Sequence, residues 1–117
     1  MGLDCLGFIL SAFGINMNNG RIEAIIMNKE KIKELMVITA EECGELTQAC
    51  CKIYRWDIDS IYENGSNKQR LLEEAGDVMA MISIMVDNDL LTEQELNDRI
   101  DYKKRKLKEW SSLFDET

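Results

Sequence analysis

Residues 28–55 read NKEKIKELMVITAEECGELTQACCKIYR, and this stretch decides the fold. Uncharged side chains recur along it at alternating steps of four and three, which is the spacing of the buried seam of a helical bundle. The predicted seam consists of Ile32, Met36, Thr39, Cys43, Leu46, Cys50 and Ile53. We therefore expect one long helix over these residues, packed against at least one other helix.

Two further helices are predicted after a break at residues 56–65. Ser66 and Thr92 each begin a capping-box pattern, in which the first turn of a helix satisfies its own backbone N–H groups. These starts predict helices over about residues 66–88 and 92–113. The chain contains no proline, and helices of this length with short links are typical of a bundle. The predicted fold class is all-α, a helical bundle of three main helices plus short N-terminal and connecting helices.

Residues 1–27 are predicted to be an N-terminal extension of unclear role, and residues 28–117 the helical domain. Residues 1–15 are apolar, as the core of a signal peptide is. They contain Asp4, lack a basic start and a small-residue cleavage pattern, and are too short to cross a bilayer. We therefore expect a short helix or an accessory arm here, in a cytoplasmic protein with no membrane partner.

Residues 78–86, VMAMISIMV, are apolar around the whole circumference of the predicted helix. Such a helix needs to be covered on every side. Three helices from a chain of 117 residues are too few to supply that cover. The sequence therefore predicts that the bundle is completed by oligomerisation, as a homodimer or a homotetramer.

The composition excludes several classes of function. The formal net charge is −8, which argues against nucleic acid as a partner, because that affinity comes from lysine and arginine. The chain has no histidine, which excludes the Ser-His-Asp and Cys-His nucleophile systems and the common catalytic zinc sites. Its four cysteines show no C-x-x-C pairing and are expected to be small apolar residues in a reducing cytosol.

Four acidic residues form two pairs at helical spacing, Glu42 with Glu45 and Glu74 with Asp77. Residues three apart on a helix are about 60° apart around its axis, so each pair points its carboxylates the same way. If the two helices pack antiparallel, the four carboxylates converge. Oxygen ligands without histidine or cysteine are typical of magnesium, with manganese as a substitute, and magnesium usually accompanies phosphate chemistry. Salt bridges to lysines of neighbouring helices are the competing interpretation.

Cations and an aromatic residue follow the first acidic pair. Lys52 falls on the same helical face as that pair and Arg55 close to it, so both are candidates for contact with phosphates. A bound metal makes hydroxide available near neutral pH, and Glu41 or Glu73 is a candidate to accept the proton. Trp56 is a candidate for stacking on a nucleobase, or for packing the connection against the bundle.

Residues 41–46, EECGEL, followed by residues 73–78, EEAGDV, resemble the E-E-x-x-E … E-x-x-D signature of the MazG-like nucleotide pyrophosphohydrolases. These enzymes belong to the all-α NTP pyrophosphatase superfamily, alongside the dimeric dUTPases and the dCTP pyrophosphatases. The resemblance covers about residues 28–110. It implies magnesium-dependent hydrolysis of a nucleoside triphosphate between the α- and β-phosphates, giving a monophosphate and pyrophosphate, in a dimer or tetramer.

The resemblance also implies roles by position. The implied metal ligands are Glu42, Glu45, Glu74 and Asp77. Glu41 is implied as a supporting acid or the water-activating base, and Lys52 and Arg55 as phosphate contacts. Two alternatives stay open: a non-catalytic helical module for interaction or regulation, and a base-specific dUTP or dCTP hydrolase of the same superfamily. A calcium-binding protein is disfavoured because the chain has no D-x-D-x-D-G loop.

Overall fold

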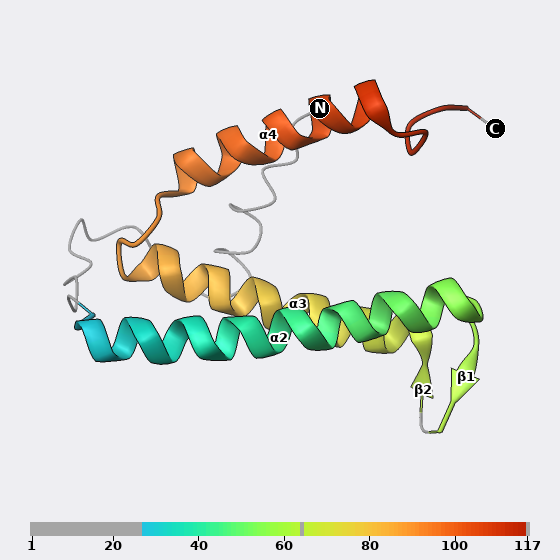
Figure 1. Ribbon diagram of the computed structural model, residues 1–117, viewed down its shortest axis with the longest axis horizontal. Coiled ribbons are helices and arrows are strands. Elements are labelled where there is room, and N and C mark those ends of the chain that lie inside the picture. Colours follow the sequence, from blue (N-terminus) through green and yellow to red (C-terminus); the bar gives the residue numbers. More distant parts are fainter. Residues whose placement is uncertain (1–26, 64, 117) are drawn as a thin grey trace, which may run out of the picture. The chain divides into compact units, whose positions relative to one another are not determined.

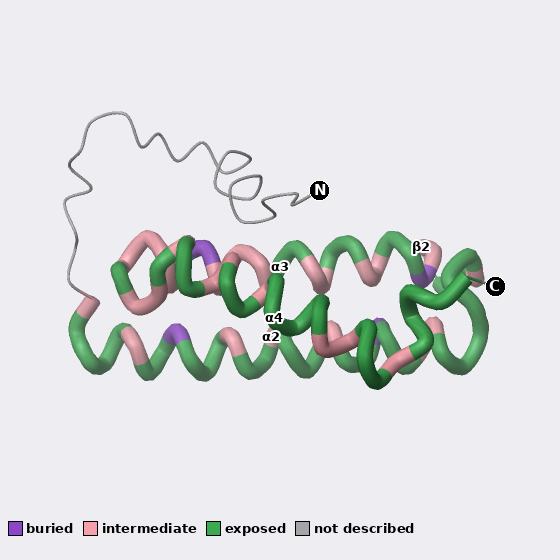
Figure 2. The backbone as a smooth tube through the Cα atoms, turned by 90° about the horizontal axis from the view of Figure 1, so that it is seen from above, coloured by how far each residue is buried: buried purple, intermediate pink, exposed green. Residues whose placement is uncertain are grey.

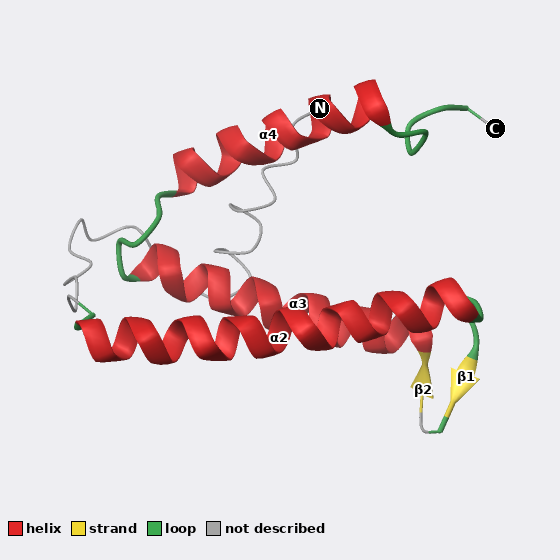
Figure 3. Cartoon of the chain, in the orientation of Figure 1, coloured by secondary structure: helices red, strands yellow, loops and turns green. Residues whose placement is uncertain are grey.

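The computed structural model describes residues 27–63 and 65–116, and this part of the chain is mostly helical (Figure 1 and Figure 3). Its elements are helix α2 (Lys29–Arg55), strands β1 (Ile61–Tyr62) and β2 (Gly65–Ser66), helix α3 (Asn67–Asp87) and helix α4 (Glu93–Trp110). The all-α prediction is confirmed at this level, with the three main helices close to their predicted bounds. The predicted N-terminal helix or arm lies outside the described residues.

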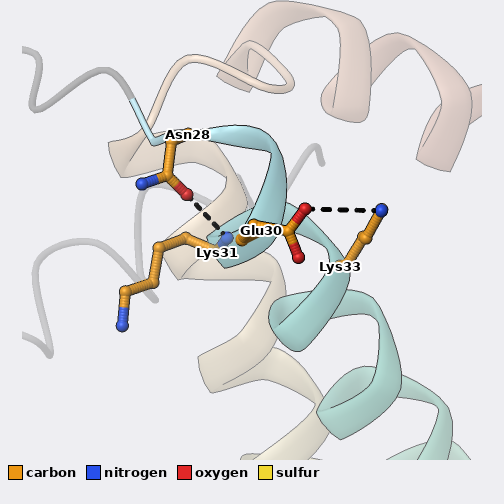
Figure 4. A network of polar contacts seen from close by, with 4 residues as sticks. All are labelled: Asn28, Glu30, Lys31 and Lys33. Carbon is orange, nitrogen blue, oxygen red and sulfur yellow. Dashed lines mark hydrogen bonds and ion pairs between the residues drawn. The ribbon is translucent and has the colours of Figure 1, made fainter.

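Helix α2 begins at a side-chain cap (Figure 4). The Asn28 side-chain oxygen accepts a hydrogen bond from the Lys31 backbone N–H at 2.9 Å, which satisfies one of the N–H groups that the first turn leaves without a partner. Glu30 lies 3.5 Å from the Lys33 ammonium, and an acidic residue here also suits the positive end of the helix dipole. At the other end, the first residue after the helix donates its backbone N–H to the Lys52 carbonyl at 3.0 Å.

A small β-hairpin connects α2 to α3, where the sequence predicted a short connecting helix. Strands β1 and β2 pair antiparallel, with Ile61 opposite Ser66. Glu63, which follows β1, has a φ of 55°, a left-handed conformation of the kind that turns use. The prediction of a connecting helix was wrong because strands of two residues have too few alternating positions to give a sequence pattern.

Helix α3 starts with half of the predicted capping box. The Ser66 hydroxyl accepts a hydrogen bond from the Gln69 backbone N–H at 3.1 Å, but the Gln69 side chain donates forward to Glu73 at 3.4 Å and not back to the cap. From the hairpin, α3 runs back alongside α2 in the opposite direction (Figure 1 and Figure 2). The antiparallel arrangement that the acidic pairs require is therefore present.

The less exposed residues of α2, Lys52 apart, form one stripe with alternating steps of three and four (Figure 2). This stripe consists of Ile32, Leu35, Thr39, Glu42, Leu46, Ala49 and Ile53. The predicted seam was wrong at three positions. It contained Met36, Cys43 and Cys50, whereas the less exposed residues are the ones that directly precede them, Leu35, Glu42 and Ala49. Helix α2 carries two adjacent stripes of mostly uncharged residues, and apolarity alone does not show which of them is covered within one chain.

The second of these stripes is exposed, and we call it the α2 stripe. It consists of Met36, Ala40, Cys43, Thr47, Cys50 and Tyr54, all of them exposed. These residues carry no charge over about 27 Å of helix, and Tyr54 is 92% exposed. In the predicted all-round apolar segment of α3, Met81 and Ser83 are buried but Ile84 is 37% exposed, so this segment is covered only in part.

Helix α4 begins at a side-chain cap. The Thr92 hydroxyl accepts a hydrogen bond from the Glu95 backbone N–H at 3.1 Å, and the Glu95 carboxylate accepts one from the Thr92 N–H at 3.3 Å, so the predicted capping box is complete. The helix ends at Trp110, earlier than predicted, because Ser111 has an extended backbone, with φ −122° and ψ 161°. The Ser111 N–H and hydroxyl both donate to the Leu107 carbonyl, at 2.9 and 2.7 Å, and so complete the last turn. No helix in the described part of the chain is long and apolar enough to cross a membrane.

Candidate metal centre

Three of the four predicted metal ligands come together between α2 and α3. Carboxylate oxygens of Glu42, Glu45 and Glu74 all lie within 4.8 Å of one another, and we call these residues the acidic cluster. Glu42 belongs to the less exposed stripe of α2, while Glu45 lies one turn further along and is exposed. Glu74 is half-buried and comes from the antiparallel helix. The antiparallel helix pair therefore makes one site from two acidic pairs that are far apart in the sequence.

Two oxygens of the acidic cluster lack a compensating contact. The Oε2 atoms of Glu42 and Glu74 are buried and have no hydrogen-bond partner among the described residues. Burial raises the pKa of the Glu42 carboxyl, and the charges of Glu45, Asp77 and Glu41 raise it further. A buried carboxylate is unfavourable unless a cation, a donor or a proton compensates it. The cluster is therefore suited to hold a cation.

The pKa of Glu74 is raised in the same direction and for similar reasons. Burial is the first cause, followed by a hydrogen bond with Glu45 and by the charges of Glu45, Asp77 and Glu42. Like charges crowded together disfavour ionisation of every member, unless an opposite charge is placed among them. Acids of α2 thus raise the pKa of Glu74 on α3, and Asp77 of α3 raises the pKa of Glu42 on α2.

The remaining predicted acids lie around the acidic cluster and not in it. Asp77 is exposed and is absent from the set of converging oxygens, although its charge contributes to the raised pKa values of Glu42 and Glu74. Glu41 is exposed at the rim. Glu73 is also exposed and accepts a hydrogen bond from Gln69 at 3.4 Å. The protomer therefore presents three converging carboxylates, with further acids within electrostatic reach.

A cavity of about 250 Å³ lies beside the acidic cluster, and we call it the small cavity. It is lined by Glu45, Gln48, Ala49, Lys52, Arg70 and Glu74. The structure thus brings Lys52, a predicted phosphate contact, next to two of the carboxylates. A site that joins carboxylates with nearby cations is suited to an anionic ligand bound through a metal ion.

Arg70 is the site residue that the sequence reasoning missed. Its terminal nitrogen lies 3.5 Å from the Tyr62 carbonyl oxygen and 3.7 Å from a carboxylate oxygen of Glu63, while its buried Nε has no partner in residues 27–63 and 65–116. The signal was present in the sequence, because Arg70 precedes Glu74 by four residues and so shares its helical face. Gln48, three residues after Glu45, also shares the helical face of that residue and lines the small cavity, but it was not predicted as a site residue.

Two predicted substrate contacts lie further out. The Arg55 guanidinium is 5.9 Å from the centre of the Trp56 ring, and Arg55 does not line the small cavity. Trp56 is 64% exposed and lines a second cavity, next to the hairpin. Comparison with known proteins adds no assignment, since the chain matches no family model, no curated protein and no solved structure.

Proposed function

We propose that the protein is a nucleoside triphosphate pyrophosphohydrolase that uses magnesium to hydrolyse an NTP or dNTP between its α- and β-phosphates. The observation that carries this proposal is the acidic cluster, with two buried oxygens that have no donor, beside a cavity lined by Lys52 and Arg70. The resemblance of the two acidic pairs to the MazG-like signature supports the same reaction.

The residues present fit a magnesium ion, because the converging ligands are all carboxylates. Glu42, Glu45 and Glu74 would hold the ion, with Asp77 as a fourth ligand from the rim. When bound, magnesium supplies Lewis-acid polarisation of phosphate oxygens and a lowered pKa of bound water. Manganese offers the same coordination chemistry as a substitute.

The chain's own residues account for the rest of the reaction. Lys52 and Arg70, which line the small cavity, neutralise phosphate oxygens, and Arg55 in the last turn of α2 is a proposed outer contact. Water attacks the α-phosphorus, the bond to the bridging oxygen breaks, and pyrophosphate leaves. Glu41 or Glu73, both exposed near the acidic cluster, takes the proton from the attacking water.

The proposed active form is a homodimer or homotetramer. The described part of the chain buries few apolar side chains, namely Leu35, Ala49 and Met81. The α2 stripe stays exposed along its whole length, and large exposed apolar surfaces mark association sites. A second copy of the chain is the proposed cover, and we propose no nucleic acid or membrane partner. Free thiols at Cys43, Cys50 and Cys51 support a reducing cytoplasm as the proposed location.

The test is product analysis on a panel of NTPs and dNTPs with magnesium. The expected products are the monophosphate and pyrophosphate, and orthophosphate alone would reassign the reaction. Glu45→Gln is expected to lower turnover at least about 100-fold, because loss of even a supporting residue around a metal has effects of 10–100-fold. Glu34→Gln is the matched control, since Glu34 is an exposed residue of the same helix whose ion pair, within the described part of the chain, is with Lys31 at 3.7 Å. Full activity of Glu45→Gln would contradict the ligand assignment, and no hydrolysis of any nucleotide would favour a non-catalytic module.

A further inference from the structure

A second cavity, of about 530 Å³, lies where the hairpin meets the ends of α2 and α3, and we call it the hairpin cavity. It is lined by Lys52, Trp56, Ser60, Ile61, Tyr62 and Asn67. Its volume is within the range of small-molecule sites, which are mostly apolar with a few polar groups. Two aromatic rings and an isoleucine supply the apolar wall, and an ammonium, a hydroxyl and an amide supply the polar groups. This composition suits a flat ligand with a polar edge.

Hydrogen bonds hold the residues that form one wall of the hairpin cavity in place. Asn67 is only 3% exposed, and its side-chain Nδ2 donates to the Asp57 carbonyl at 2.7 Å. Its backbone N–H donates to the Ser60 carbonyl at 2.9 Å, and the next N–H, from Lys68, donates to the Ile58 carbonyl at 2.9 Å. These bonds tie the connection to the first turn of α3. A wall that is held in place before binding loses little conformational entropy when a ligand arrives.

The hairpin cavity adjoins the candidate metal centre. Lys52 lines both cavities, and its ammonium lies 5.8 Å from the centre of the Tyr62 ring. Arg70, which lines the small cavity, contacts the Tyr62 carbonyl. Lys52 follows Glu45 by two helical turns, about 10 Å along the axis. A ligand that joins phosphates to a ring through a sugar can therefore occupy both cavities at once.

On this geometry, and resting on the proposed function, we propose that the hairpin cavity binds the nucleobase of the substrate by stacking on Trp56 and Tyr62. The cavity makes the enzyme select nucleotides over inorganic polyphosphates. An aromatic face stacks on any base, so the cavity favours nucleotides as a class. The Asn67 amide nitrogen is committed to Asp57, which leaves the amide oxygen, with Lys52 and Ser60, to contact the polar edge of the base.

The binding test uses Trp56 as its own reporter. The chain has two tryptophans, so Trp110→Phe leaves Trp56 as the single tryptophan, whose emission is followed with excitation that tyrosine does not absorb. Titration with a nucleoside monophosphate in magnesium is expected to quench its emission, and titration with inorganic tripolyphosphate is expected to leave it unchanged. A second change, Tyr62→Ala, in the Trp110→Phe protein should weaken nucleotide binding about 10- to 100-fold, which corresponds to the loss of one stacking contact.

The matched control is Tyr102→Ala. Tyr102 lies on α4, is 39% exposed and does not line the hairpin cavity, so this variant should bind nucleotide as the parent does. Tyr62 is itself 56% exposed, so its replacement should leave the fold intact, as a melting curve will check. Ile61→Ala, at an 80% exposed position, is the second variant, and a several-fold weaker binding is expected there.

Kinetics separate this inference from the hydrolase proposal. Tyr62→Ala is expected to raise KM for nucleoside triphosphates about 10- to 100-fold and to leave hydrolysis of inorganic tripolyphosphate unchanged. Equal nucleotide binding by the parent and Tyr62→Ala, in a protein that hydrolyses nucleotides, would overturn the inference and spare the hydrolase. The opposite result is also informative. If nucleotides quench Trp56, if Tyr62→Ala abolishes this quenching, and if no nucleotide is hydrolysed, the base-binding cavity is supported and the hydrolase proposal is rejected. An unchanged emission with every nucleotide would overturn the inference.

Discussion

Replacement of Glu74 by glutamine tests the candidate metal centre without requiring a substrate. The change keeps the side-chain shape and removes one of the three converging carboxylates. In the absence of metal, Glu74→Gln is expected to be more stable than the wild type at neutral pH, because Oε2 of Glu74 is buried beside other acids and has no hydrogen-bond partner in the part of the chain that the structure describes. Magnesium is expected to raise the melting temperature of the wild type, and to do so far less in the variant.

The size of this effect follows from linkage between binding and folding. At a magnesium concentration about 100-fold above the dissociation constant, binding adds about 2.7 kcal/mol to the free energy of unfolding. For a domain of this size, that corresponds to a rise of about 10 °C in melting temperature. If loss of one ligand weakens binding about 100-fold, the same concentration adds only about 0.4 kcal/mol. The expected rise in the variant is then about 2 °C.

The assay is thermal unfolding followed by circular dichroism, in EDTA and in increasing magnesium chloride. Glu34→Gln serves as the control, since it makes the same change at an exposed position of α2 and should keep the full magnesium response. The reasoning is refuted if the wild type shows no magnesium-dependent rise up to the millimolar range. It is equally refuted if Glu74→Gln keeps a rise as large as that of the wild type.

Three further outcomes are expected. Asn67→Ala should lower the free energy of unfolding by about 1–3 kcal/mol in urea titrations, because the Asp57 carbonyl loses its 2.7 Å donor; a loss below about 0.5 kcal/mol would contradict this. Cys43→Glu, which places a charge on the α2 stripe, should shift sedimentation towards the monomer, and an unchanged oligomer would exclude this stripe as the interface. Burial raises the pKa of Asp87, so the folded state binds its proton more readily than the unfolded state. Stability relative to Asp87→Asn should therefore fall as pH rises from the ordinary carboxyl range through the raised pKa, and a pH-independent difference would rule this out.

The helices could be predicted from the sequence because their signals are local. Asn28 and Thr92 lie at the cap positions of α2 and α4, and the side chains there satisfy neighbouring backbone groups whatever the rest of the chain does. The hairpin could not be predicted in this way. Its pairing of Ile61 with Ser66 goes with bonds from the start of α3 to residues earlier in the connection, namely Asn67 N–H to the Ser60 carbonyl and Lys68 N–H to the Ile58 carbonyl.

The candidate site was predictable only in part, for reasons of geometry. The spacing of Glu42 and Glu45 fixes their common face, but only the packing of α3 against α2 decides that Asp77 stays outside the converging set. Arg70 shares a face with Glu74 at a spacing of four residues, and its position was readable once the face of Glu74 was known. The hairpin cavity could not be predicted, because the conformation of the connection that brings Trp56 and Tyr62 to it has no local sequence signal.

The position of Glu42 in the less exposed stripe of α2 has a consequence for how this protein can change. An aliphatic residue would pack there more favourably than a carboxylate, and the same holds for half-buried Glu74 on the opposing helix. Selection for thermal stability alone will therefore favour leucine at these two positions. The result is an α2–α3 pair that packs more tightly but has lost two of its three converging carboxylates. Under the proposed function, selection for turnover acts against that replacement, and these two positions then record whether a lineage keeps the proposed reaction.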